Sequence, residues 1–217
     1  MKFQRARTAS QVADRQQEIL NVGRCLYEKG GLDAVTFTAI SEMTSFTRPA
    51  IYSYYKNRDD ILLDILRIEV SEVNTAILDK LKSCDTLDTE DLALIMYDEL
   101  SKHCLMLKML SVNYSCIEYG CTMESLINFK RPFMESIKKI EVELKRLYPH
   151  ACDERIRNFK YIYHAFVSSI YPVTHLTEKQ KKAVNEIDPD YVPGSYESVC
   201  KEGLRLITSS LKECNCK

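Results

Sequence analysis

The chain has 217 residues and a net charge of −1, with 45% hydrophobic and 28% charged residues. This is the balance of an ordinary soluble protein, and no run approaches the ~20 apolar residues that a membrane-spanning helix needs. The N-terminal sequence MKFQRARTAS has basic residues but no apolar stretch after them. We therefore expect no secretory signal, no membrane partner and a cytoplasmic location.

The charge is distributed unevenly along the chain. Residues 1–58 carry nine Lys and Arg but five Asp and Glu, a net charge of +4, which leaves −5 for the rest. A basic end on an acidic body favours contact of that end with a polyanion. A difference of this size is also common in proteins that bind nothing acidic.

The nine cysteines fit neither a disulfide framework nor a zinc site, because no C-x2-C pair is present. Cys116 and Cys121 lie close in the sequence, as do Cys214 and Cys216, but no histidine pattern follows them. In a reducing cytosol we expect nine free thiols, most of them buried. A thiol-based sensor is the alternative.

Helical periodicity dominates from the N-terminus onward. Thr8-x-x-Gln11 is a capping-box pattern, and the helix that follows it should end at Gly30-Gly31. Thr36 can cap a short second helix that turns Phe37, Ile40 and Met43 inward.

A tight turn at Ser45 and Phe46 should lead into a third short helix. That helix begins near Thr47, runs to about Tyr55, and has Pro49 in its first turn, where a missing N–H is tolerated.

Asn57 can cap a long fourth helix that extends to about residue 82. Periodicity then predicts helices over five further ranges, 89–102, 104–115, 122–147, 153–175 and 195–212. Pro132 should kink or break the third of these, and Thr177-x-x-Gln180 can cap a short extra helix.

Residues 36–55 therefore read as helix, tight turn and helix, anchored by Ile40, Phe46, Ile51 and Tyr55. The opposite face of the second helix is free to enter the major groove of double-stranded DNA. Arg48 can donate two hydrogen bonds to a guanine, and Pro49 and Ala50 can touch a thymine methyl group. The predicted DNA-binding residues are Thr36, Thr38, Thr47, Arg48, Pro49, Ala50, Tyr52, Ser53, Tyr54, Lys56 and Arg58.

The segment EILNVGRCLYEKGGLDAVTFTAISEMTSFTRPAIYSYYKNRDDILLDIL resembles the DNA-binding domain of the tetracycline-repressor (TetR) family. RPAIY is similar to the Gln-Pro-Thr-Leu-Tyr type of recognition helix, and IYSYYKNRDDIL fits the cap of the helix that follows. The sequence departs from the family pattern at Tyr27, where phenylalanine is usual. It departs again at Ser45 and Phe46, which replace a common Gly-Val, and lacks the usual alanine and glycine before that turn.

The resemblance implies an all-α protein with two domains. Residues 1–58 would form an N-terminal three-helix DNA-binding domain with a helix-turn-helix, and residues 59–217 a C-terminal helical domain for ligand binding and dimerisation. The implied partners are double-stranded operator DNA, palindromic in sequence, a small-molecule effector and a second copy of the chain.

The range 153–175 has two apolar stripes, and a helix of that kind is buried on two sides. In the TetR family the last two long helices form a four-helix bundle across a two-fold axis. The predicted dimer interface therefore comprises Ile162, Ala165, Ser169, Cys200, Gly203, Leu204, Ile207 and Leu211.

A ligand pocket among the middle helices would be largely apolar or aromatic, although ordinary core packing explains each candidate equally well. The candidates are Tyr97, His103, Met106, Tyr114, Glu118, Phe129, Tyr163 and Phe166.

Three functions compete. The first is a repressor that a small, largely apolar ligand releases from its operator. The second is an enzyme, which the absence of G-x-G-x-x-G, G-x-S-x-G, H-E-x-x-H and P-loop motifs argues against. The third is an activator or a thiol- or redox-responsive regulator of the same fold. We expect no catalytic residues, no metal and no cofactor.

Overall fold

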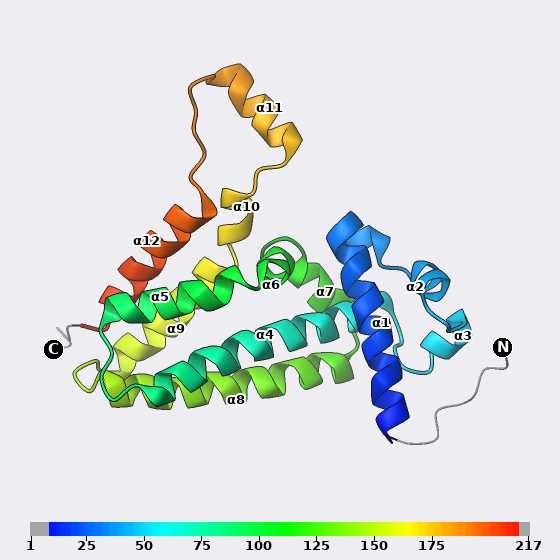
Figure 1. Cartoon of the computed structure of the whole chain (residues 1–217), viewed down its shortest axis with the longest axis horizontal. Helices are drawn as coiled ribbons and strands as arrows, with labels where there is room; N and C mark the ends of the chain where they lie inside the picture. Colours follow the sequence, from blue (N-terminus) through cyan, green and yellow to red (C-terminus); the bar gives the residue numbers. More distant parts are fainter. Residues whose placement is uncertain (1–8, 213–217) are drawn as a thin grey trace. The chain divides into compact units, whose positions relative to one another are not determined.

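The computed structural model describes residues 9–212, and every regular element in that range is a helix (Figure 1). The prediction of an all-helical fold is confirmed. The helices are α1 Ala9–Gly30, α2 Phe37–Met43, α3 Arg48–Ile51, α4 Arg58–Ser83, α5 Thr89–Ser101, α6 Cys104–Lys108, α7 Tyr114–Gly120, α8 Met123–Leu147, α9 Asp153–Val167, α10 Ile170–Thr174, α11 Glu178–Ile187 and α12 Tyr196–Ser209. Within the same range, no helix combines the length and the apolar character needed to span a membrane.

The chain divides into two compact units. The first comprises Met1–Glu69 and Asn113–Phe133, and the second Val70–Val112 and Met134–Lys217. Both α4 and α8 contribute residues to each unit, so the chain passes between the units inside helices. The domain boundary after residue 58 stays a prediction.

The first unit has a core made of the residues that the sequence singled out. Ile40 and Ile51 are fully buried, and Phe46 and Tyr55 are nearly so. Gly31 has a φ of 68° directly after α1, a conformation that glycine adopts without strain, so α1 ends where the sequence predicts. Thr36 caps α2 by accepting a hydrogen bond from the Ala39 N–H, as expected.

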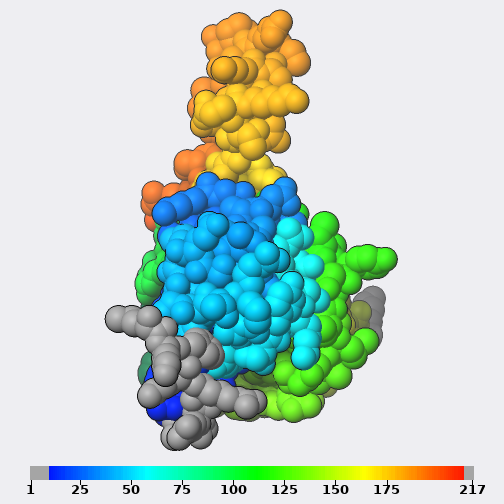
Figure 2. Space-filling model, turned by 90° about the vertical axis from the view of Figure 1, so that its right-hand side faces the viewer, coloured from blue at the N-terminus to red at the C-terminus, as the bar shows by residue number. Residues whose placement is uncertain are grey.

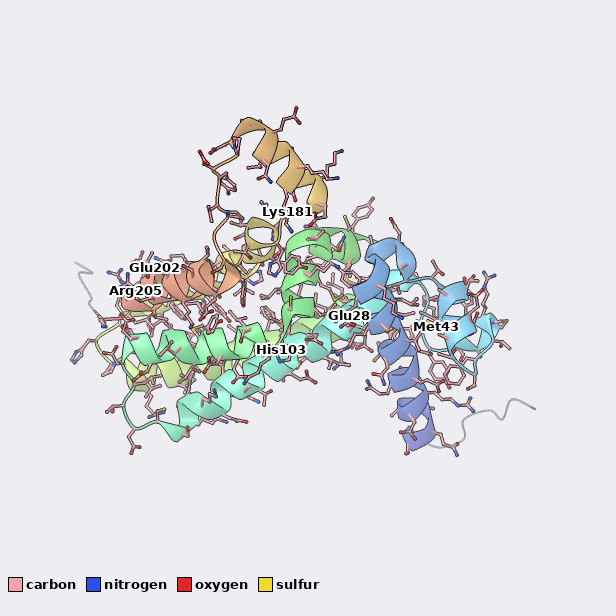
Figure 3. The ribbon with its side chains drawn as sticks, turned by 45° about the horizontal axis from the view of Figure 1, so that its top comes forward. Glu28, Met43, His103, Lys181, Glu202 and Arg205 are labelled. Carbon is pink, nitrogen blue, oxygen red and sulfur yellow. The ribbon has the colours of Figure 1, made fainter. Side chains whose placement is uncertain are left out.

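Met43 differs from the expectation, and Tyr27 has a partner that the sequence did not indicate. Met43, expected to point inward, is 48% exposed at the last residue of α2 (Figure 3). Tyr27 is fully buried, and its hydroxyl donates a hydrogen bond to Asn113 Oδ1 within the same unit. The residue that departs from the usual phenylalanine therefore has a specific polar partner.

The second unit contains a helical layer of α5, α9 and α12. Leu92 and Leu100 of α5, Ile156 of α9, and Cys200 and Leu204 of α12 are buried there. Gly203 lies so close to α9 that an added Cβ would stand 2.4 Å from a ring carbon of Phe166. The small side chains of α12 thus allow a close helix crossing, and that crossing is made inside one chain.

Two predicted helices have different bounds. The range 104–115 consists of α6, a π-helical turn Met109–Asn113 and the start of α7. The range 153–175 is broken into α9 and α10 at Ser168 and Ser169. The break has a local cause, because Pro172 has no N–H for the Ser168 carbonyl, and Ser169 Oγ donates to the Phe166 carbonyl.

Pro132 does not break α8, which continues from Met123 to Leu147. The carbonyl that loses its helical partner is that of Asn128, an exposed residue, so water can serve as a donor there.

The expectation of nine free thiols is wrong at Cys152, which is disulfide-bonded. The free cysteines of the described range are Cys25, Cys84, Cys104, Cys116, Cys121 and Cys200. Cys214, Cys216 and Thr8 of the predicted capping box lie outside the described residues.

Candidate nucleic-acid interface

The predicted recognition helix is a single turn. Thr47 is its N-cap, Arg48 and Pro49 open it, and it ends at Ile51 rather than near Tyr55. Residues 52–54 continue as a hydrogen-bonded turn. A helix this short is not stable alone, so the buried Ile51 and Tyr55 must hold it on the rest of the unit.

One face of this segment is polar and open to solvent (Figure 2). Among the predicted DNA-binding residues, Ala50, Tyr54 and Arg58 are partly covered. The exposed ones are Thr36, Thr38, Thr47, Arg48, Pro49, Tyr52, Ser53 and Lys56. The first unit therefore brings side chains from α2, α3 and the turn after α3 onto one surface.

The two ends of the helix-turn-helix differ in how their cations are placed. Arg58 lies 3.7 Å from Asp33 and 3.4 Å from Asp59, so part of its charge is compensated within the chain. Arg48 and Lys56 are exposed, and no ion pair holds either of them within the described residues. These two cations are better placed than Arg58 to meet an anionic partner.

Aromatic contacts fix the geometry of the surface. Tyr52 is 49% exposed, and its ring packs edge-on against Phe37 with the ring centroids 4.4 Å apart. On the other side, the Arg15 guanidinium lies 5.6 Å from the centroid of the Phe46 ring. The sequence gave no reason to predict this contact of Arg15, because Phe46 lies about thirty residues away in the chain.

Behind this surface, the first turn of α4 is bound to the turn between α7 and α8. Asp60 is 2% exposed and accepts hydrogen bonds from Thr122 N at 2.8 Å and from Thr122 Oγ1 at 2.9 Å. Asn57 caps α4, as predicted, and its Nδ2 also donates to the Gly120 carbonyl at 3.1 Å. The helix-turn-helix is therefore held by a segment about 60 residues away in the chain.

A hollow of about 210 Å³ adjoins this contact within the first unit. Its walls include Tyr54, Lys56, Asp64 and Phe129. Asp64 is already engaged, because it accepts hydrogen bonds from Tyr55 Oη at 2.8 Å and Arg67 Nε at 2.6 Å. Burial and the neighbouring Asp64 raise the pKa of Tyr55, so its hydroxyl stays a donor.

The predicted ligand-binding residues fall in both compact units. Tyr114, Glu118 and Phe129 belong to the first, where Lys130 Nζ lies 2.7 Å from Tyr114 Oη and 2.6 Å from Glu118 Oε1. Burial is the main cause that raises the pKa of Tyr114 to about 12. The members of the second unit are Tyr97, His103, Met106, Tyr163 and Phe166.

In the second unit, Tyr97 is part of an aromatic cluster that the sequence did not reveal. Its ring centroid is 6.2 Å from that of Tyr196, which is 5.9 Å from that of His175. His175 in turn stacks on Tyr171 at 4.2 Å. These rings come from α5, α12 and the end of α10, which are far apart in the sequence. Helical periodicity within one segment could therefore not predict that they lie together.

The predicted dimer residues separate into two groups by exposure. Ile162, Ala165 and Ser169 are exposed, as an interface between subunits requires. Cys200, Leu204 and Leu211, by contrast, are buried against their own chain, and Ile207 and Gly203 are partly covered. Cys200, Leu204 and Leu211 thus pack inside their own chain and Gly203 lies against Phe166, and the place of all four in a subunit interface stays a prediction.

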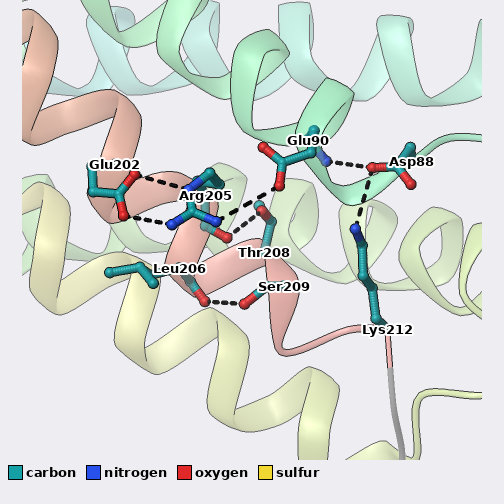
Figure 4. Close-up of polar contacts among 8 residues, drawn as sticks. All are labelled: Asp88, Glu90, Glu202, Arg205, Leu206, Thr208, Ser209 and Lys212. Carbon is teal, nitrogen blue, oxygen red and sulfur yellow. Dashed lines mark hydrogen bonds and ion pairs between the residues drawn. The ribbon is translucent and has the colours of Figure 1, made fainter.

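The outer face of α12 carries different residues (Figure 4). Leu206 is 58% exposed, and Arg205 forms hydrogen bonds with Glu202 at 2.8 and 2.6 Å. Arg205 also lies 4.0 Å from Glu90 of α5, while Lys212 lies 3.6 Å from Asp88. A shallow groove of about 410 Å³ between α5 and α12 includes Arg205 and Glu202 in its walls.

Two family models match the chain. One, described as "Bacterial regulatory proteins, tetR family", matches residues 19–65. The other, described as "Tetracyclin repressor-like, C-terminal domain", matches residues 68–209. A comparison with curated proteins found no match. The first matched range covers the helix-turn-helix and its polar face.

Proposed function

Because the chain belongs to the TetR family of DNA-binding transcription regulators, we propose that it is a repressor released from its operator by a small, largely apolar ligand. Regulators of this family are transcription factors and not enzymes. The match over residues 19–65 implies that the chain binds operator DNA. We propose that residues 1–58 bind DNA and that residues 59–217 bind the ligand and a second subunit. We also propose that the protein acts in the cytoplasm.

The observation that carries the proposal is the exposed polar face above a buried apolar core in residues 36–56. Arg48 at the first position of α3 is exposed, while Ile51, one turn later, is fully buried. The N-terminal residues of a recognition helix are those that reach base edges in the major groove. Arg48 would donate to a guanine, and Lys56 would contact a phosphate.

Dimer formation is supported by the outer face of α9. Ile162 is 53% exposed, Ala165 is exposed one turn later, and Ser169 is exposed just after the helix ends at Val167. On α12 the exposed apolar residue is Leu206, which we add to the proposed interface beside Ile207 and the buried candidates. A two-fold dimer would present two recognition helices to successive major grooves, about 34 Å apart, and so match a palindromic operator.

The aromatic cluster of Tyr97, Tyr171, His175 and Tyr196 supports an apolar or aromatic effector. Desolvation raises the pKa of Tyr196, which keeps its hydroxyl neutral beside the Cys200 thiol. Aromatic faces favour a ligand that is apolar or aromatic, although Lys201 Nζ lies 4.7 Å from the centroid of the Tyr97 ring and adds one cation to the cluster. A ligand would release DNA only if it bound the low-affinity state more tightly, and a tenfold effect needs about 1.4 kcal/mol of coupling.

The base-reading role is tested on an operator sequence selected from random duplexes by the purified protein. Arg48→Ala should cost about 1–3 kcal/mol on that sequence and relax the preference at one base pair. Lys56→Ala, the control, should weaken specific and random duplexes alike and reduce the salt dependence. Equal losses on both duplexes for Arg48→Ala would exclude a base contact.

A thiol- or redox-responsive regulator is the second candidate, and the disulfide-bonded state of Cys152 is the observation that favours it. Operator affinity measured with and without a thiol reductant separates the two. A reductant-dependent affinity that disappears in Cys152→Ser would favour redox control over release by an apolar ligand.

A further inference from the structure

Residues 176–194, here called the arm, connect α10 to α12 and include α11. In Figure 1 the arm extends away from α10 and α12, and Figure 3 places Lys181 on α11 apart from Glu202 and Arg205 of α12. No residue of α11 is buried, and only Val184 among its ten residues is partly covered. The helix α11 of the arm thus has no extensive packing contact within its own unit.

The sequence nevertheless specifies a helix at this position. Thr177 and Gln180 form a complete capping box, and Lys181 pairs with Glu178 at 2.8 Å. Helices of about ten residues are marginal in water even when such local contacts are present. A helix with encoded start signals and no buried face indicates a partner outside this chain.

The distal part of the arm exposes apolar side chains among the carboxylates Glu186, Asp188 and Asp190. Ile187 is 86% exposed and Val192 is 85% exposed, with the half-exposed Tyr191 between them. The base of the arm is different, because His175 stacks on Tyr171 and Ser195 caps α12 by accepting a hydrogen bond from Ser198 N. An anchored base with exposed apolar side chains beyond it has the form of an element that reaches onto another surface.

The net charge of the arm does not favour a polyanionic partner. It carries three lysines against four carboxylates, Glu178, Glu186, Asp188 and Asp190. A net charge of −1 gives no electrostatic attraction to nucleic acid or to an anionic membrane.

The position of the arm in the chain points to a second copy. The arm is inserted between α9 and α12, the helices whose exposed apolar residues Ile162 and Leu206 form the proposed two-fold interface. In an isologous dimer each arm would therefore start beside the same helices of its partner. We propose that the arms are exchanged, so that Ile187 and Val192 pack on α9 and α12 of the partner subunit. This inference rests on the proposed homodimer.

The arm is tested in the full chain by sedimentation velocity over a dilution series. Ile187→Lys combined with Val192→Lys should raise the dimer Kd about 100-fold, tenfold for each residue, where each tenfold corresponds to about 1.4 kcal/mol. Asn185→Lys, the control, adds one of these charges on the opposite side of α11 and should change the Kd less than threefold. Circular dichroism spectra should show the same helix content for all three proteins.

A second measurement identifies the surface that the arm meets. Dimers mixed from ¹⁴N- and ¹⁵N-labelled chains, treated with an amine cross-linker, should give links from Lys179 or Lys182 that join a light to a heavy peptide. A monomeric parent would overturn the homodimer and the arm exchange together. A parent dimer with an unchanged Kd in the double variant, or with intrachain links alone, would overturn the arm exchange and leave the dimer standing.

Discussion

Two amphipathic helices of this protein, α3 and α12, present their faces in different ways. In α3 the polar residue Arg48 is exposed and the apolar residue Ile51 is buried, as the sequence predicts. In α12 the apolar residues expected at a subunit interface, Leu204 and Leu211, are buried in the chain itself. The difference is that α3 is covered by elements close to it in the sequence, whereas α12 is covered by α5 and α9, which are distant in the sequence.

The two helices differ in how far away in the sequence their contacting residues lie. The turn at Phe46 and the cap at Thr36 lie within about a dozen residues of α3, so local signals fix which face is free. For α12, the apolar stripe predicts burial but not the surface that buries it. Packing inside the chain and packing between chains have the same hydrophobic driving force.

The largest expected effect comes from comparing a buried and an exposed leucine on α12. Leu204→Ala should lower the free energy of unfolding by about 2–5 kcal/mol, because Leu204 is fully buried. Leu206→Ala, two residues away and 58% exposed, should change it by less than about 0.5 kcal/mol. Urea unfolding at concentrations where the chain is monomeric measures the free energy of unfolding of both variants. Equal losses would mean that Leu204 is not the more buried of the two residues.

A smaller effect is expected behind α3. Asp60→Ala removes the acceptor of two hydrogen bonds from Thr122 and should destabilise the chain by about 1.5–3 kcal/mol. Asp59→Ala is the comparison variant, because the ion pair of Asp59 with Arg58 is long, at 3.4 Å, although its carboxylate also lies against Gly120; it should cost under about 1 kcal/mol. If thermal unfolding and operator binding are unchanged in Asp60→Ala, the α7–α8 turn does not hold the helix-turn-helix.

The smallest effect depends on pH and belongs to the second unit. Hydrogen bonds from Lys160 and then Lys145 lower the pKa of Glu141 below its usual range. The carboxylate therefore stabilises the fold above the unfolded value of about 4.3, and this contribution is lost as the pH falls through the lower folded value. It should not exceed about 1 kcal/mol, because the pair is partly solvated.

Glu141→Gln should thus reduce the free energy of unfolding at pH 7 while changing it little near pH 3. Urea unfolding between pH 3 and pH 7 provides the test. A deficit that is constant over this range would assign the loss to packing rather than to the charge of Glu141.

Within the first unit, the sequence predicted more than the order of helices. Capping residues Thr36 and Asn57, the stop at Gly31 and the anchors of the helix-turn-helix all have the predicted local roles. The resemblance to the TetR family, carried by the same residues, agrees with the family match over residues 19–65. The extent of α3 was overestimated, since residues 52–54 form a turn that periodicity cannot distinguish from helix.

Sequence alone determined the helical character of the chain and the polar face of residues 36–56, because caps, glycine conformation and helical periodicity act over a few residues. Tertiary structure decided that Tyr27 meets Asn113, that Asp60 meets Thr122, and that Tyr97 joins rings from α10 and α12. It also decided that Gly203 serves a crossing with Phe166 inside the chain. These pairings join residues about 40 to 100 positions apart, and many partners of similar size and polarity satisfy the same local pattern. Only the packing of the folded chain selects one of them.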